Sequence, residues 1–237
     1  MYETENRTMA RTEAARAEID VGLRSHMLRV YNYMASGLLL TGIVAYFVAN
    51  TPAVANAIFG TPLQWLVMLA PLAFVMVLSF GIHRMTFATA QAVYWAYAAV
   101  MGASLASILL VFTGASVARV FFITAGTFGA MSLYGYTTKA DLSKFGSFLF
   151  MGLIGIVLAS VVNLFVASSA LQFAISVIGV IVFVGLTAYD TQRIKEIYLA
   201  SDDGETAGKK ALMGALSLYL DFINLFMMLI QLLGNRR

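Results

Sequence analysis

Seven long apolar segments constrain the fold of this 237-residue chain more than any other feature. Each is about as long as a helix that crosses the bilayer core, which is about 30 Å thick and needs roughly 20 residues. Breakers rich in Pro, Gly, Asn, Thr and Asp separate several of them. We therefore predict membrane-spanning helices over Leu28–Ala49, Gln64–Ile82, Ala90–Phe112, Ser116–Tyr136, Phe145–Val166, Leu171–Tyr189 and Leu212–Leu233.

The composition agrees with this interpretation. Hydrophobic residues make up 60% of the chain and charged residues only 11%, whereas soluble domains are about half apolar and a quarter charged. The mean hydropathy is +0.83. We predict an all-α polytopic membrane protein that needs no cofactor. The absence of cysteine excludes disulfides and thiolate metal sites, and a net charge of +3 gives no reason to expect nucleic acid as a partner.

The distribution of Lys and Arg predicts the orientation. With the N-terminus in the cytoplasm, twelve basic residues fall on the inner side and three on the outer side, which is the bias that cytoplasmic loops carry. We expect a cytoplasmic N-terminal segment over residues 1–27, a transmembrane domain over residues 28–237, and a C-terminus outside. Residues 1–27 lack the apolar region of a cleaved signal peptide.

A polar stripe runs along the last predicted span, and Asp221 lies within it. A carboxylate at the centre of a span costs roughly 2.5–3.5 kcal/mol on insertion scales, so its presence needs a reason. Ser217, Asp221, Asn224 and Gln231 recur at helical spacing, which places them on one face that lipid cannot satisfy. The face lines a pathway or a proton site, or its small and polar residues simply hold helices together.

Asp190 lies at the inner end of the sixth span and has two interpretations. It pairs with Asp221 in the cytoplasmic half of the bundle, or it is an interfacial aspartate that balances Arg193 and Lys195. Asp221 is roughly 10 Å deeper than the inner edge of its helix, while Asp190 is close to that edge. The sequence alone does not show that the two carboxylates are in contact.

Four stretches carry a resemblance to a known family. They are LRVYNYMASGLLLTG in the first span, SLYGYTTKADLSKFGSFLFMGLIG across the fourth and fifth, GLTAYDTQ in the sixth and LYLDFINLF in the seventh. Together they resemble the Bax inhibitor-1 (TMBIM) family in its bacterial YccA-like branch, over nearly all of the chain from Leu28 onward. A bacterial inner membrane is the location that this resemblance implies.

The resemblance implies a seven-helix bundle with the last helix central and a pH sensor made of two aspartates, which fall on Asp190 and Asp221. Members of the family behave as pH-sensitive calcium leaks, and some bacterial members are linked to a membrane-bound protease. The family can place an arginine of the second span against the aspartates. In this chain His83 and Arg84 are the candidates for that basic partner, and Gln64–Ile82 carries no acidic gate.

Enzyme classes fit less well, so we expect no catalytic activity. Intramembrane aspartyl proteases also carry Tyr-Asp on one span, but Asp221 follows Leu220 rather than the glycine-flanked motif of that class, and the Pro-Ala-Leu element is missing. A rhomboid-like protease needs a histidine in a later span, and the two histidines are His26 and His83. A retinal protein needs a lysine in the last span, and Leu212–Leu233 has none.

We therefore expect a pH-sensitive calcium-permeable leak gated by Asp190 and Asp221, with lipid and Ca²⁺ as partners. The alternative is a non-conducting regulator that binds a membrane protease or another membrane protein. Two aspartates at close range should hold one proton between them and titrate as a unit, and Ca²⁺ could replace that proton in transit because it prefers oxygen ligands. If Arg84 or His83 reaches the pair, both carboxylates stay ionised around the cation, and the sign of the pH response reverses.

Overall fold

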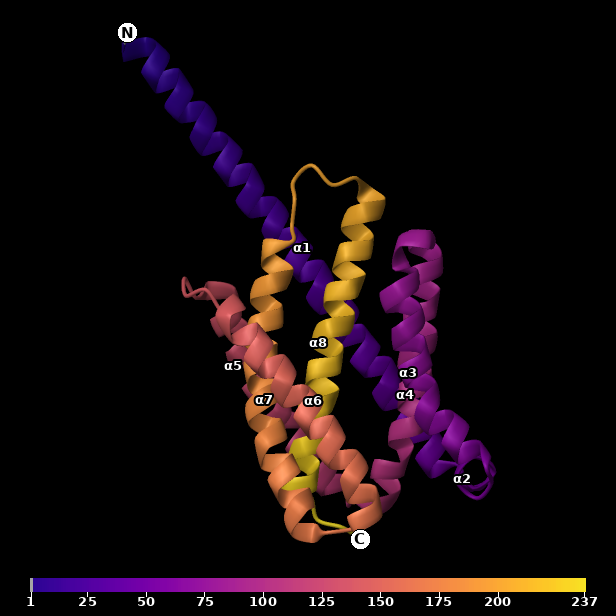
Figure 1. The fold of residues 1–237 in the computed structure, drawn as a ribbon. Helices are drawn as coiled ribbons and strands as arrows, with labels where there is room; N and C mark the ends of the chain where they lie inside the picture. The colour runs from indigo at the N-terminus through magenta and orange to yellow at the C-terminus, as the bar shows by residue number, and fades with distance from the viewer. Residues whose placement is uncertain (1) are drawn as a thin grey trace.

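The computed structural model describes the backbone of residues 2–237 and the side chains of residues 21–237. The chain forms a bundle of helices (Figure 1). The elements are α1 (Tyr2–Asn50), α2 (Pro52–Phe59), α3 (Leu63–Gly81), the 3₁₀ helix η1 (Ile82–Arg84), α4 (Phe87–Val111), α5 (Gly114–Thr137), α6 (Ser143–Val166), α7 (Ser169–Glu196) and α8 (Gly204–Leu233).

Between residues 21 and 237, seven helices are long and apolar enough to cross a membrane. This confirms the predicted all-α polytopic fold, with one addition. The sequence predicted only a break where the eight-residue helix α2 lies. Pro52 begins α2, because its fixed φ suits the first turn of a helix. Helix α1 is continuous across residue 28, where the sequence suggested a boundary between an N-terminal segment and the transmembrane domain.

The last helix occupies the centre of the bundle, as the family resemblance implied. Helix α8 packs against α7, α1, α5 and α4, and Leu218, Tyr219 and Leu225 on it are fully buried. Helices α3 and α6 lie at the periphery, where α3 packs on α4 and α6 packs on α7. Their outer faces carry exposed apolar side chains such as Phe80 and Phe165, which suit contact with lipid.

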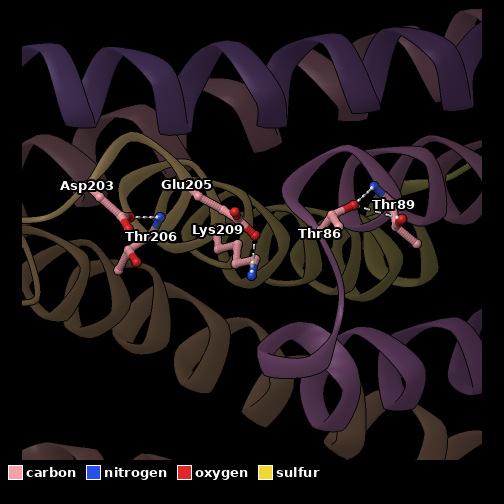
Figure 2. Close-up of polar contacts among 6 residues, drawn as sticks. All are labelled: Thr86, Thr89, Asp203, Glu205, Thr206 and Lys209. Carbon is pink, nitrogen blue, oxygen red and sulfur yellow. Dashed lines mark hydrogen bonds and ion pairs between the residues drawn. The ribbon is translucent and has the colours of Figure 1, made fainter.

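Polar contacts define where two of the spans begin (Figure 2). The hydroxyl of Thr86 accepts a hydrogen bond from the backbone N–H three residues further on, at the start of α4. Asp203 Oδ1 accepts one from the Thr206 N–H at 2.6 Å, at the start of α8. Glu205 and Lys209 form an ion pair of 2.8 Å one turn apart. The bonds to Thr86 and Asp203 satisfy backbone donors that a helix start leaves free.

The C-terminal residues are tied to the turn between α4 and α5. The Thr113 N–H donates to Asn235 O at 3.0 Å, and the Arg237 N–H donates to Val111 O at 2.9 Å. The Asn235 N–H also donates to the Ser116 hydroxyl at 2.8 Å. The end of the central helix is thus fixed to its neighbours by backbone hydrogen bonds.

Candidate ion site between α6, α7 and α8

A cavity of about 510 Å³ lies between α6, α7 and α8, toward the end of the bundle where α8 begins. It is the place where the structure brings the two predicted aspartates together. Asp190 on α7 and Asp221 on α8 both line it, with Arg193 beside them. The prediction that the two carboxylates share one site therefore has a geometric basis that the sequence could not supply.

Asp221 is the more deeply enclosed of the two. Its side chain is 5% exposed, and its Oδ2 atom has no hydrogen-bond partner among the groups that the structure describes. The charged neighbour that acts on it electrostatically is Asp190. A buried carboxylate oxygen without a partner is costly, so its presence calls for an explanation.

Asp190 is half-buried and lies nearly two turns before Glu196, the last residue of α7. Arg193 is the charged neighbour that acts on it, yet the ion pairs found among residues 21–237 do not join these two side chains. Arg193 is exposed, so solvent screens the effect of its charge on Asp190. The interfacial interpretation of Asp190 and its pairing with Asp221 are thus compatible in this geometry.

The polar stripe of α8 enters the cavity only in part. Ser217 and Asn224 line it on either side of Asp221. The Asn224 amide Nδ2 donates to Leu220 O at 2.8 Å, which leaves its carbonyl oxygen as an acceptor. Gln231 is exposed near the end of α8 and does not line the cavity.

The candidates for a basic partner lie elsewhere. His83 and Arg84 are exposed on η1, next to α3, which packs on α4 rather than on α7. Neither side chain lines the cavity. The basic side chain that lines the cavity is Arg193. In the sequence, its position about one turn after Asp190 was the feature that could have indicated this.

Helix α6 contributes residues that sequence reasoning missed. Gly146 and Ser147 line the cavity opposite the aspartates. A Cβ at Gly146 would overlap the ring of Tyr189, so this glycine lets the ring lie between α6 and α7 beside Asp190. The glycine lies within the family-like block across the fourth and fifth spans, and that block was its only signal.

The donor set suits a cation that passes rather than one that stays. In the part of the chain with described side chains, no group of three or more His, Asp or Glu residues could hold a metal ion. The cavity offers two carboxylates, the hydroxyls of Ser147 and Ser217 and the amide oxygen of Asn224. Ca²⁺ takes 6–8 oxygen ligands in stable sites, so it would keep part of its water here.

Comparison with known proteins relates the whole transmembrane region to one family. The sequence model of the family described as "Inhibitor of apoptosis-promoting Bax1" matches residues 23–237. The chain is 51% identical to the inner membrane protein YbhL of Escherichia coli K12, over 91% of this chain and 94% of that protein. It is 49% identical to an uncharacterized protein of Rickettsia prowazekii, over 95% and 96% of the two chains. A Deinococcus radiodurans protein is 45% identical over 91% and 92%.

Proposed function

This chain is a membrane protein of the Bax inhibitor-1 family, and we propose that it forms a pH-sensitive, calcium-permeable leak in a bacterial inner membrane. The observation that carries the proposal is the shared cavity of Asp190 and Asp221, one of them buried with an unpaired oxygen. The relative from Escherichia coli, named an inner membrane protein, supports the location. Ca²⁺ is the transported substrate in this proposal, and no catalytic step is involved.

The proposed gate is the proton that the two carboxyl groups share. In a cavity of low dielectric constant, two carboxylates at close range cannot both ionise at low cost. One proton between Asp190 and Asp221 would supply the hydrogen bond that Asp221 Oδ2 lacks. It would hold α7 and α8 together at this level, and its loss would drive them apart unless a cation took its place.

The position of Arg193 decides the proposed sign of the pH response. A basic side chain in contact with both carboxyls would keep them ionised, but Arg193 is exposed and His83 and Arg84 do not line the cavity. The shared proton is therefore the closing element. Calcium flux should rise as pH rises and the proton leaves.

The bundle supports a closed resting state. Beyond Asn224, the interior face of α8 is apolar, with Leu225, Leu229 and Ile230 buried. An ion in the cavity meets this apolar segment before it can reach the far side of the membrane. Opening thus requires α8 to move relative to α7, which is the movement that repulsion between Asp190 and Asp221 would promote.

The test is calcium entry into liposomes that contain only the purified protein. A leak predicts entry above that of protein-free liposomes, and entry that rises with pH. Asp141→Asn is a matched control, because Asp141 is exposed in the loop before α6 and does not line the cavity. If the protein gives no entry at any pH, the alternative of a non-conducting regulator of a membrane protease or another partner replaces this proposal.

A further inference from the structure

Three cavities follow one another along the space between α1 and α5, away from the aspartates. The first, about 430 Å³, is lined by Arg24 and Tyr31 of α1 and by Phe128 and Tyr136 of α5. The second, about 870 Å³, begins one turn further along α1, at Ala35. The third, about 230 Å³, shares lining residues with the second. The first and second share no lining residue but follow one another along α1, and we infer that the three belong to one groove, which we call the α1–α5 groove.

The walls of the α1–α5 groove are apolar. Leu39, Ile43 and Phe47 line it on α1 and are exposed, and Phe222 of the central helix lies at its floor. This depth corresponds to the hydrocarbon core, where a surface of this kind meets acyl chains rather than water. A groove of helical length between two spans therefore fits an extended hydrocarbon chain.

Among residues 21–237, Arg24 is the one charged residue that lines the groove, and it lies at one end. Arg24 lines the first cavity and is exposed. Lys195 reaches the same place from α7, because its Nζ donates to Tyr136 O at 3.0 Å and lies 5.6 Å from the centroid of the Tyr136 ring. Among the side chains that the structure describes, residues 21–237, no carboxylate lines this cavity.

Uncharged polar residues line the far end of the groove. Asn50 and Thr51 line it there. Both side chains donate to carbonyl groups of α1, at Tyr46 O and Phe47 O, each at 2.8 Å. The polarity of the groove therefore sets the direction of an occupant with one anionic end and one apolar end.

We propose that the α1–α5 groove binds an anionic phospholipid of the leaflet next to the basic end of the bundle. The phosphate lies by Arg24 and Lys195, and one acyl chain extends between α1 and α5. Half of the hydrocarbon core is about 15 Å, or about ten helical residues. The chain thus reaches from the level of Arg24 to that of Ala35, where the second cavity begins. Basic pockets between spans are sites of this kind.

Native mass spectrometry of the protein released from vesicles tests the site. The vesicles contain equal amounts of phosphatidylglycerol and phosphatidylcholine. The proposal predicts one retained phospholipid per chain, with phosphatidylglycerol strongly preferred. Arg24→Gln should weaken that preference about fivefold, the effect of one basic residue near an anionic headgroup. Arg29→Gln is the control, because Arg29 lines a different cavity with Asn32 and Trp95, and it should change nothing.

A second pair of variants tests the acyl chain. Gly129 lines the first cavity and has open space where a Cβ would be, so Gly129→Leu should fill the groove and remove the retained lipid. Gly126 has the same open space but lines none of the three cavities, so Gly126→Leu should retain it. Equal retention in the two leucine variants, equal effects of the two arginine variants, or equal retention of the two lipids by the unaltered protein would overturn the proposal.

Discussion

The hydroxyl of Thr41 on α1 lies 2.6 Å from the hydroxyl of Tyr219 on α8. Thr41 also lies 2.8 Å from Ala98 O of α4, to which it can only donate. Its oxygen must therefore accept from the Tyr219 O–H. Both side chains are buried, so one threonine joins the central helix to two of its neighbours, two residues before Asp221 along α8.

Thr41→Val should destabilise the bundle, because it keeps the shape of the side chain but leaves the Tyr219 hydroxyl and Ala98 O without this partner. Buried groups that lose their partner cost about 1–3 kcal/mol, and less between membrane helices. We expect a loss of about 1 kcal/mol in reversible unfolding in detergent. Thr127→Val on α5, whose side chain is only half-buried, is the control. A loss no larger than that of the control would contradict this role of Thr41.

Asp203→Ala should weaken the start of α8 in a pH-dependent way. The Thr206 backbone N–H, which donates to Asp203 Oδ1, lowers the pKa of this exposed carboxyl below 3.8. The stabilisation is therefore complete above the ordinary carboxyl value and is lost as pH falls through the lowered pKa. The thermal midpoint of the variant should fall below that of the unaltered protein at neutral pH and approach it in acid.

Asp203→Asn separates the charge from the cap, since asparagine also caps helices. Its thermal midpoint should stay closer to that of the unaltered protein at neutral pH than does that of Asp203→Ala. A gap between the alanine variant and the unaltered protein that stayed constant down to about pH 2, below the ordinary carboxyl range, would show that the carboxylate has no part in the cap.

Arg119→Ala should weaken the attachment of the C-terminal residues to α5 and leave the pH dependence of calcium entry unchanged. Arg119 Nη2 donates to Leu233 O at 3.4 Å, from the start of α5 to the end of α8, and lies far along α8 from Asp221. We expect faster hydrogen exchange over residues 234–237 and an unchanged pH dependence of calcium entry. A shifted pH midpoint would instead place Arg119 in the gating network.

The orientation follows from charge alone and can be tested by fusion reporters. A reporter after Arg237 should be found outside the cytoplasm and one before Met1 inside it, because seven spans place the termini on opposite sides and basic loops stay in the cytoplasm. Two termini on the same side would require an even number of spans.

Periodicity predicted much of the fold and part of the site. Helical spacing placed Ser217, Asp221 and Asn224 on one face, and all three line the cavity. Gln231 has the same spacing but lies about 15 Å beyond Asp221 along the axis of α8, outside the cavity. Sequence spacing gives the face of a helix and leaves open how far along it a site extends.

The neighbours of each helix could not be derived in the same way. His83 and Arg84 close the second span, but α3 packs on α4, which takes them away from the aspartates. The proximity of Gly146 to Tyr189 depends on how α6 and α7 are aligned, which no local pattern encodes. Tertiary packing decides such contacts; the family resemblance indicated the pairing of Asp190 with Asp221 but not these.

Calcium entry into liposomes that carry Asp190→Asn, Asp221→Asn or both tests the central claim most directly. Over about pH 5 to 8, one gating proton can change the flux by up to about tenfold per pH unit. Each single substitution should flatten this dependence, and the double substitution should add little, because the two carboxyls act as one unit. Asp141→Asn should keep the full response. If Asp190→Asn also keeps it while Asp221→Asn abolishes it, the two aspartates are not a pair.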